Sequence, residues 1–282
     1  MSALKSRKRR EVTSYSDWMS QLPAELHSIH LFKLIIPGSH DSMSYDLDVN
    51  SSIIEPERLK RFSKFCCVRK MVRKWAMTQD ETITNQLDAG VRYFDLRIAR
   101  KRNDVNPTRL YFYHGLYTRT DVEDINDWAG RHPKEILILA LSHFKGFDRK
   151  IEKDLHKHLI NFTKTLFGAK LFLRTVKIYP EIWSKIPYYY GNSMNPLEVQ
   201  SKLRYYLENR VRPSKGFFVC GLNLTLPDNA RILKSLPRIL QWVKQQAGKI
   251  PMNIIASDIA TRDQFVPTIV KLNTSKGAMH EA

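Results

Sequence analysis

Two histidines stand directly after apolar, strand-like runs, where their side chains can meet in one site. His40 and its neighbour Asp41 follow the run 33–38, and His114 ends a second run. Two imidazoles can divide acid and base work, because one removes a proton from an attacking hydroxyl while the other protonates the leaving oxygen. Carboxylates such as those of Asp41 and Asp258 hold imidazoles in the useful tautomer. The pattern therefore predicts paired acid–base catalysis by His40 and His114.

An arginine and a further acidic residue accompany the histidines. Arg97 lies two residues after Asp95 in the apolar run 91–99, so both side chains face the same side of a strand. A guanidinium offers several hydrogen-bond donors to a charged phosphoryl transition state. Asp95 is expected either to touch the substrate or to hold Arg97 in place. Ser142 and His143, at the end of another apolar run, are expected to line the substrate pocket or to cap the strand.

The elements that must position these residues alternate between apolar strands and amphipathic helices. We expect strands over 33–38, 91–99, 109–115, 135–144, 217–225 and 253–259, and helices over 82–90, 122–132, 148–167, 196–210, 235–246 and 265–272. Such alternation implies a parallel sheet with right-handed crossovers. For a chain of 282 residues the natural single-domain closure is a (β/α) barrel. Its active site would lie at the carboxyl ends of the strands, where the polar residues are.

The amino-acid composition is typical of a folded protein. Of the 282 residues 43% are hydrophobic, which is enough for a sizeable core. The three cysteines form no even framework and no C-x-x-C, which is typical of a reducing compartment. No apolar run approaches the roughly 20 residues that span a bilayer, and the first residues have no signal-peptide core. We therefore expect a cytoplasmic protein with a basic disordered tail over 1–16 and a single domain over 17–282. The basic tail would also suit a nuclear import signal and hence a nuclear pool of the protein.

The net charge of +18 gathers in the tail and in the segment 56–75. Clusters of Lys and Arg suit phosphate groups of lipids or nucleic acids. No zinc finger, RNA-recognition motif or recognition helix accompanies them, so nucleic acid is not an expected partner. Apolar residues in the segment recur every three or four positions, which predicts one helix with an apolar stripe of Phe62, Phe65, Val68, Val72 and Trp75. We expect this helix to dock on an anionic membrane surface; the alternative is that the stripe packs on the barrel.

Three segments taken in order point to a known family. IIPGSHDS (35–42), DAGVRYFDLRI (88–98) and FYHGLYT (112–118) resemble the successive signatures of the X domain of phosphatidylinositol-specific phospholipases C. DWMSQLP, KWAMTQ and NIIASD are similar to segments of the short animal proteins that carry an X domain and no Y domain. The resemblance covers about residues 17–273. It implies an irregular TIM-type barrel and a phosphoric diester hydrolase that acts on phosphoinositides.

The resemblance also implies a role for each candidate residue. His40 matches the general base that activates the inositol 2-hydroxyl, and His114 matches the general acid that protonates the departing diacylglycerol oxygen. Asp41 matches the partner of the acid histidine, and Asp258 is placed to partner His40. Cleavage of a glycerophosphoinositide would then release an inositol 1,2-cyclic phosphate.

The same segments predict chemistry without a metal or another cofactor. Calcium-dependent members of the family use an asparagine after the first histidine, Glu-x-Asp in the second strand and a glutamate in the fourth. Here the matching positions hold Asp41, Asp95-x-Arg97 and Leu141. A guanidinium where a Ca²⁺ ligand would sit is incompatible with the ion, and it can supply the positive charge itself.

One stretch departs from the family pattern. The aromatic run 188–190 is expected to cover the barrel mouth, with ordinary packing as the alternative. Between this run and the helix expected over 148–167, roughly one strand and its loop are missing. Only TVKIY (175–179) is available to fill the gap, and a barrel does not tolerate an open edge well. The shortening keeps a second hypothesis open, a lipid-binding pseudoenzyme. A glycerophosphodiester phosphodiesterase ranks last, because the His-Arg and Glu-x-Asp of that family are not matched.

Overall fold

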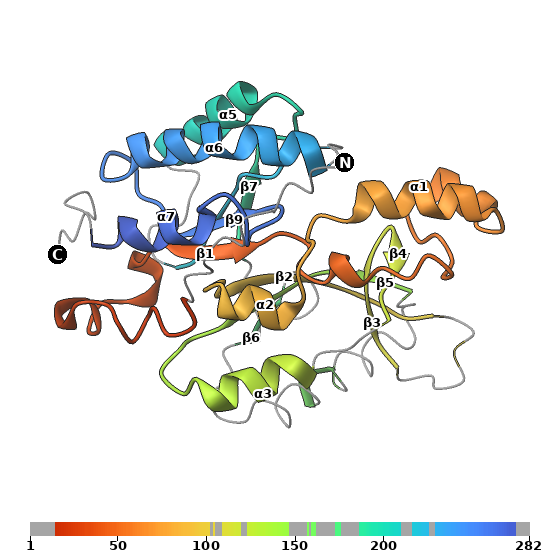
Figure 1. Cartoon of the computed structure of the whole chain (residues 1–282), viewed down its shortest axis with the longest axis horizontal. Helices are drawn as coiled ribbons and strands as arrows, with labels where there is room; N and C mark the ends of the chain where they lie inside the picture. Colours follow the sequence, from red (N-terminus) through yellow and green to blue (C-terminus); the bar gives the residue numbers. More distant parts are fainter. Residues whose placement is uncertain are drawn as a thin grey trace, which may run out of the picture.

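A curled parallel sheet forms the centre of the protein (Figure 1). The computed structural model describes residues 15–101, 104, 109–119, 123–146, 157, 159–161, 173–175, 186–209, 216–225 and 229–274. Within these residues the parallel strands follow the order β6-β5-β2-β1-β9-β8-β7. Their bounds are β1 Ile36–Ser39, β2 Tyr93–Ala99, β5 Ile138–Lys145, β6 Leu173–Thr175, β7 Tyr188–Tyr190, β8 Val219–Gly221 and β9 Ile254–Ser257.

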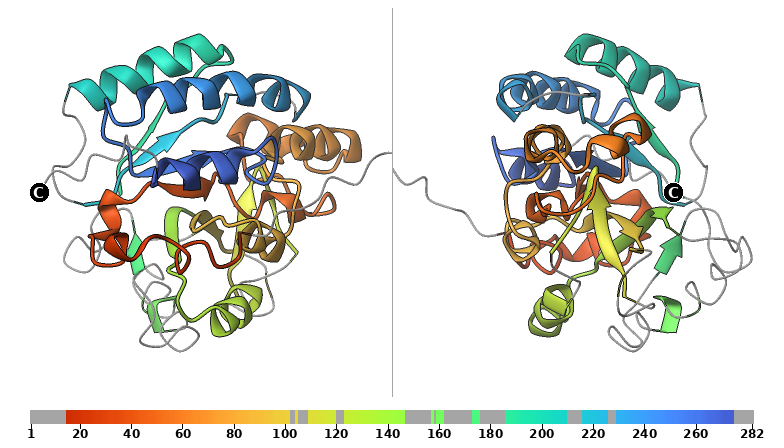
Figure 2. Two further views of the ribbon diagram at one scale, coloured as in Figure 1. Left: turned by 60° about the vertical axis from the view of Figure 1, so that its left-hand side comes forward. Right: turned by 90° about the vertical axis from the view of Figure 1, so that its right-hand side faces the viewer.

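Helices cover the outside of this sheet. In Figure 1, α5 and α6 lie above the strands and α3 lies below them, while Figure 2 shows the strands curling inside the layer of helices. Their bounds are α1 Cys66–Ala76, α2 Ile83–Asp88, α3 Glu123–Arg131, α5 Pro196–Glu208, α6 Asn229–Gln246 and α7 Phe265–Leu272. In the described part of the chain, four short 3-10 turns precede them: η1 Ala24–Leu26, η2 Leu31–Lys33, η3 Ser44–Asp46 and η4 Glu57–Phe62.

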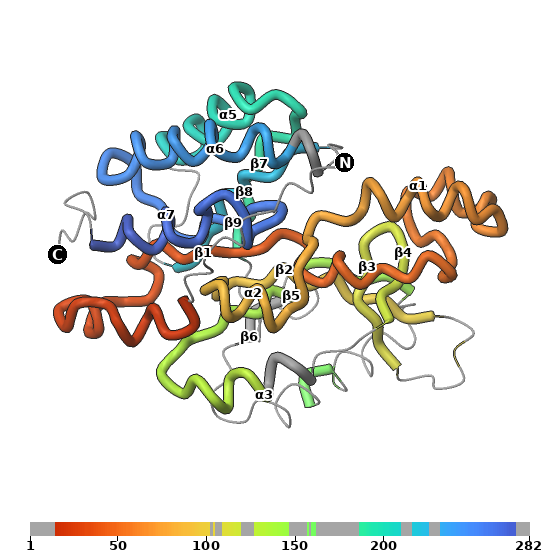
Figure 3. The backbone as a smooth tube through the Cα atoms, in the orientation of Figure 1, coloured from red at the N-terminus to blue at the C-terminus, as the bar shows by residue number. Residues whose placement is uncertain are grey.

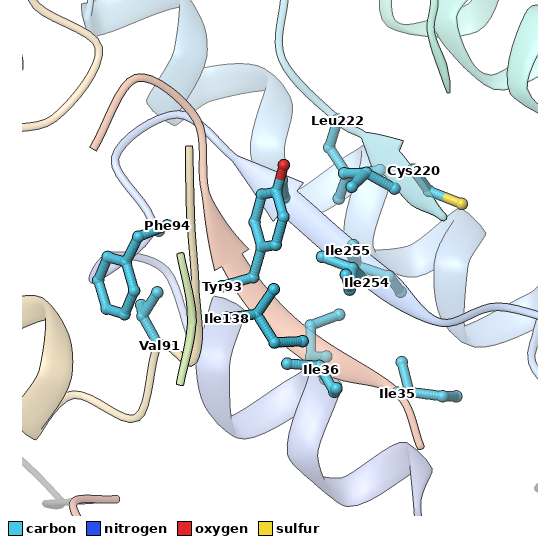
Figure 4. Packing of buried hydrophobic residues seen from close by; sticks show 14 of the residues in the cluster. Ile35, Ile36, Val91, Tyr93, Phe94, Ile138, Cys220, Leu222, Ile254 and Ile255 are labelled. Carbon is cyan, nitrogen blue, oxygen red and sulfur yellow. The ribbon is translucent and has the colours of Figure 1, made fainter. Parts of the chain in front are cut away.

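The central strands are buried on both faces, as their near-continuous apolar runs predict. Ile36 of β1 pairs with Ile254 of β9, and neither side chain has exposed surface. On β2 the consecutive residues Tyr93 and Phe94 point to opposite sides of the strand (Figure 4). Gly38 is required where β1 crosses Tyr93, because a Cβ atom at this position would lie 2.8 Å from the tyrosine ring. These contacts fix β1 and β2, the two strands that lead into the candidate site.

A buried ion pair ties the start of the described chain to the sheet. Arg92 lies 2.7 Å from Glu135, and both side chains are fully buried. The same guanidinium donates hydrogen bonds to the backbone carbonyls of Tyr15 and Ser16. These two residues, which were expected in a disordered tail, are therefore held against the sheet. Residues 1–14 lie outside the described residues.

The barrel-type fold predicted from the sequence is confirmed, with one strand direction wrong. The strand expected over 109–115 is β3 (Tyr111–His114), which pairs antiparallel with the end of β2 and turns back into β4 (Leu116–Tyr117). Alternating apolar residues predict a strand but not its direction, because the pattern reads the same either way. His114 therefore reaches the site from a hairpin rather than from the end of a parallel strand.

The shortened stretch still supplies a strand beside β5. β6 (Leu173–Thr175) pairs with β5 in parallel and overlaps TVKIY only at its first residue. Within the described residues β6 and β7 are not paired with each other, so the sheet is open there. The helix expected over 148–167 falls almost entirely outside the described residues.

The basic segment 56–75 is not one helix, which corrects the predicted stripe. Figure 3 traces the chain from β1 through η3 and η4 into α1. The helix breaks at Phe65, whose extended backbone caps α1. Val68 and Val72 pack with Leu47 and Leu116 of a small core cluster. Three other side chains, Phe65, Met71 and Trp75, are 46%, 37% and 42% exposed. The apolar residues are thus divided between packing and exposure.

Candidate active site

A cavity of about 1110 Å³ opens at the carboxyl ends of the parallel strands. Both histidines predicted to be catalytic line it, and so do most of the other candidate residues: Asp95, Arg97, Ser142, His143 and Asp258. Asp41 lies beneath these side chains and is 3% exposed. The structure therefore brings together every residue that the sequence predicts for the site.

His40 is fixed at its backbone and at one ring nitrogen. Its carbonyl accepts hydrogen bonds from Thr78 Oγ1 at 3.0 Å and from Gln79 Nε2 at 2.9 Å. Its Nδ1 lies 2.8 Å from Asp258 Oδ1, which makes Nδ1–H the donor of that hydrogen bond. Nε2 is therefore turned toward the cavity, where it lies 3.2 Å from Asp41 Oδ2.

His114 presents the same nitrogen from the opposite side. Its Nδ1 lies 2.6 Å from the carbonyl oxygen of Ala76, an acceptor, so Nδ1–H must be the donor. Its Nε2 lies 3.3 Å from Asp41 Oδ2, the oxygen that also faces His40. The two ring centroids are 6.3 Å apart. One carboxylate oxygen thus stands between the two nitrogens that could move protons.

Arg97 contacts the other oxygen of that carboxylate. Its Nε lies against Asp41 Oδ1, and its Nη2 is 3.4 Å from His40 Nε2. On the cavity side its Nη1 lies 3.8 Å from Glu55 Oε1. The guanidinium therefore combines one buried anionic partner with one partly exposed partner at the cavity wall.

Asp95 supports Asp41 in this structure. The backbone N–H of Asp41, which has a left-handed φ of 45°, donates to Asp95 Oδ2 at 3.3 Å. The hydroxyl of Ser142 donates to the other Asp95 oxygen, and His143 Nδ1 lies 3.0 Å from that hydroxyl. The expected role of Asp95 in contacting substrate stays a prediction, as do the pocket roles of Ser142 and His143.

Two buried carboxylates control the charge of His40. Burial lowers the pKa of His40, but the charge of Asp41 and the hydrogen bond and charge of Asp258 outweigh it and raise the pKa to about 9. Burial raises the pKa of Asp41, but Arg97 and the histidines outweigh it, so the pKa of this carboxyl lies below its usual range. The site therefore holds an ionised carboxylate between cationic groups at neutral pH.

Three of these residues have donor atoms close enough for a metal ion. One ligand atom each from His40, Asp41 and Asp95 lies within 4.8 Å of the others. The chemistry of the set disfavours a divalent cation, because Arg97 places a permanent positive charge against Asp41. That the reaction needs no metal stays a prediction, and the position of Arg97 among these donor atoms supports it.

Several residues that shape the site were not predicted. Glu55 lies beside Arg97, and Thr78 and Gln79 lie beneath His40; no spacing of chemical groups marks these residues in the sequence, although Thr78 and Gln79 are the last two residues of KWAMTQ. Tyr188 has its ring centroid 5.9 Å from that of His40, and its hydroxyl donates to Asn223 Oδ1 at 3.1 Å. The whole aromatic run 188–190 lines the cavity, which confirms its predicted place at the mouth.

No helix in the described part of the chain is long and apolar enough to cross a membrane.

Comparison with curated proteins identifies relatives over most of the chain. No family model matches the sequence. PI-PLC X domain-containing protein 1 of Danio rerio is 37% identical over 292 aligned positions, which cover 86% of this chain and 91% of the relative. Its Homo sapiens counterpart is 35% identical over 307 positions, which cover 91% and 92%. Because 307 positions exceed the 282 residues of this chain, the human protein has residues that this chain lacks.

Solved structures share the fold. Phosphatidylinositol-specific phospholipase C from Listeria monocytogenes superposes with a TM-score of 0.67 at 18% identity, covering 92% of this chain and 99% of that one. A mutant of the phosphatidylinositol-specific phospholipase C from Staphylococcus aureus gives 0.64 at 18% identity, covering 92% and 97%. These likenesses establish the irregular barrel. The identity of more than a third to curated relatives, along nearly their whole length, makes this chain a member of the PI-PLC X domain-containing protein family.

Proposed function

We propose that this protein is a phosphoric diester hydrolase of the phosphatidylinositol-specific phospholipase C type, which cleaves a glycerophosphoinositide without a metal ion. The observation that carries the proposal is the convergence of His40 Nε2 and His114 Nε2 on Asp41, at 3.2 and 3.3 Å, beside the guanidinium of Arg97. Each nitrogen is directed by a hydrogen bond at the opposite side of its ring. The arrangement has one proton acceptor, one proton donor and a fixed cation, which together suit in-line displacement at phosphorus.

The reaction needs two proton transfers around one displacement. The inositol 2-hydroxyl attacks phosphorus and gives its proton to His40 Nε2, so His40 must be neutral when the substrate is in place. As the new O–P bond forms, the bond from phosphorus to the diacylglycerol oxygen breaks, and His114 Nε2–H protonates that oxygen. Inositol 1,2-cyclic phosphate and diacylglycerol leave. Asp258 balances the charge that His40 acquires, and Asp41 stabilises the charged form of His114.

Arg97 is placed to stabilise the charge that develops on the phosphoryl oxygens. Its Nε is engaged by Asp41, which leaves the two terminal nitrogens on the cavity side. A planar guanidinium can donate to two phosphoryl oxygens at once, which a lysine ammonium cannot do with the same geometry. Glu55 at 3.8 Å is a loose and partly exposed partner, so the phosphate can replace it.

The reaction should be tested with purified protein and phosphatidylinositol vesicles in EDTA. ³¹P NMR is expected to show inositol 1,2-cyclic phosphate, and added Ca²⁺ should not raise the rate. His40→Ala and His114→Ala should each lose nearly all turnover, while His27→Ala, an exposed histidine outside the cavity, should keep it. Activity that depends on Ca²⁺, or full activity in either alanine variant of the pair, would exclude the proposed mechanism.

We also propose that α1 and the segment before it hold the cavity mouth against an anionic membrane. Trp75 and Arg58 line the cavity itself, so the segment lies at the mouth. The exposed apolar side chains Phe65, Met71 and Trp75 are interspersed with basic residues, a combination typical of interfacial binding. Each basic residue near such a surface contributes about 1 kcal/mol, so a few together support weak, reversible binding.

The contacts of the basic side chains decide which residues can test this surface. From its charge alone, Arg69 would be expected to contact lipid head groups. Instead it donates hydrogen bonds to the backbone carbonyls of Val49 and Ser63. Its replacement would disturb the loop. Charge reversal to Glu at the exposed Lys64, Lys70 and Lys74 avoids this problem.

The triple variant should lose sedimentation with vesicles that contain phosphatidylserine while still cleaving a soluble, short-chain substrate. Charge reversal at three exposed lysines outside this segment, Lys134, Lys244 and Lys249, is the matched control. Equal vesicle binding by both variants would assign the segment to packing alone.

A second candidate function is lipid binding without turnover. The open sheet between β6 and β7 within the described residues, and the residues that the relatives have in addition, favour it. The vesicle assay separates the two functions, because a pseudoenzyme would bind phosphatidylinositol vesicles and release no cyclic phosphate.

A further inference from the structure

A second cavity, of about 770 Å³, lies beside the candidate active site. The two cavities share the segment 52–58 as a wall: Ser52, Ile53, Ile54 and Glu57 face the second cavity, whereas Glu55, Pro56 and Arg58 face the first. The opposite side is formed by the ends of β2 and β5 and by the hairpin β3–β4. The second cavity is within the usual size range of small-molecule sites and opens on the same side of the barrel as the first.

Basic side chains from separate elements converge on this second cavity. Arg100 and Lys101 follow β2, Lys145 ends β5, and Lys60 belongs to η4; the acidic lining residues are Glu57 and Asp104. Glu57 is already paired with Lys60 at 2.7 Å, and Asp104 accepts the hydroxyl of Tyr111. Within the described part of the chain, no carboxylate lies within salt-bridge distance of Lys101 or Lys145. The cavity therefore has more positive than negative charge.

The backbone holds the basic residues at the ends of β2 and β5 next to each other. The N–H of Arg100 donates to the carbonyl of Lys145 at 2.9 Å, so the two residues are adjacent in the sheet. Gly146, with a left-handed φ of 76°, follows directly, and a Cβ atom there would collide with the Arg100 carbonyl oxygen. Only glycine permits this approach, which brings the basic residues of the two strands together.

An aromatic cradle orients Lys101. Its Nζ lies 3.8 Å from the centroid of the Tyr111 ring and 4.9 Å from that of Tyr117. The two rings are themselves in edge contact, at a centroid distance of 5.7 Å and an interplanar angle of 73°. Cation–π contact stabilises the ammonium without neutralising it. Lys101 is thus a positioned cation, with capacity for an anionic ligand.

From this convergence we infer that the second cavity binds a ligand carrying phosphomonoester groups on a small polar scaffold. Phosphomonoesters match the site because each has about two negative charges and three acceptor oxygens, which can be shared between the ammonium groups of Lys101 and Lys145. The ligand is either a free phosphorylated polyol or the phosphorylated head group of a membrane lipid. This site is separate from the paired histidines, and its occupancy does not depend on turnover at His40.

The test uses the full-length chain with Arg97→Gln, which weakens anion binding in the first cavity. Inositol 1,4,5-trisphosphate is the soluble probe, measured by isothermal titration calorimetry. Phosphatidylcholine vesicles with and without phosphatidylinositol 4,5-bisphosphate are the lipid probe, measured by sedimentation. The test variant adds Lys101→Gln and Lys145→Gln. The control adds Lys134→Gln and Lys249→Gln, which remove the same charge from exposed positions before β5 and before β9, at the opposite ends of the strands.

The test variant should bind at least one probe at least about tenfold more weakly than the Arg97→Gln protein does. The control variant should bind both probes as the Arg97→Gln protein does. Weaker binding of the soluble probe indicates that the ligand is a free phosphorylated polyol. Weaker binding of the vesicles alone indicates that the ligand is a lipid head group. Equal binding by the test and control variants, or no binding of either probe by the background, overturns the inference. With Arg97 restored, Lys101→Gln with Lys145→Gln should leave cleavage of a soluble substrate unchanged, which separates this result from a failure of the proposed catalysis.

Discussion

The charge of His40 gives the sharpest test of its role as the base. The pKa of His40 is about 9 because Asp41 and Asp258 stabilise the imidazolium more than burial destabilises it. A base must be neutral to accept a proton, so the rise of kcat/KM that depends on His40 should have its midpoint near pH 9 and level off only above it. Asp258→Asn keeps the shape of the side chain and removes its charge, 2.8 Å from the ring. An opposite charge at this distance is worth about 1 to 3 in pKa, so the midpoint of the rise should move to lower pH by at least about 1.

The assay is the initial rate on a soluble, short-chain phosphatidylinositol in EDTA, measured from about pH 5 to about pH 10, a range that includes the pKa of His40. The plateau rate should also fall, by about tenfold or more, because the amide of asparagine holds the tautomer of His40 less firmly. Asp80→Asn is the matched control, since Asp80 pairs with Arg262 outside the cavity at 2.9 Å. If the midpoint of the rise in kcat/KM does not move when Asp258 is replaced, His40 is not the base, even if the plateau rate falls.

The same geometry determines the outcome of three other perturbations. His40→Ala and His114→Ala should each slow turnover by about 10²–10⁴-fold, and the double variant should be little slower than either, because both act in one step. Arg97→Lys should lose most activity while its unfolding temperature stays close to that of the parent. Initial rates measure the activity, and circular dichroism measures the unfolding temperature. The raised pKa of His40 contributes stability that is fully present below pH 6.5 and is lost as pH rises through 9. The free energy of unfolding should therefore fall by on the order of 3 kcal/mol over this range, and less in His40→Gln.

The site could be predicted from sequence where it depends on strand ends. His40 and Asp258 are 218 positions apart in the chain and meet because β1 and β9 are neighbouring parallel strands. Each follows an apolar run, so the barrel rule places both at the same edge. Arg97 was predictable for a similar reason, because its spacing from Asp95 fixes the face of β2 on which it lies.

Other parts of the site depend on contacts that leave no pattern in the sequence. His114 is oriented by the backbone carbonyl of Ala76, and every residue has such a carbonyl. The prediction for the segment 56–75 was wrong for a related reason. A 3.6-residue period predicts which residues share a face only while the helix continues, and here it breaks at Phe65. Arg69 and Arg73 then turn toward backbone carbonyls of the preceding loop, where charge alone would have placed them on the surface.

Asp41 explains why the paired histidines and the arginine form one unit. Its carboxylate is buried, its N–H is fixed by Asp95, and its two oxygens face the guanidinium of Arg97 and the rings of both histidines. A carboxylate so constrained cannot follow a substrate into the cavity. In the proposed mechanism an incoming phosphodiester would therefore take the outward donors of Arg97, where Glu55 is the weaker partner, while Asp41 would keep the base and the acid at a constant separation. Under this proposal the turn that follows β1 supplies both the base and the group that holds the other site residues in position.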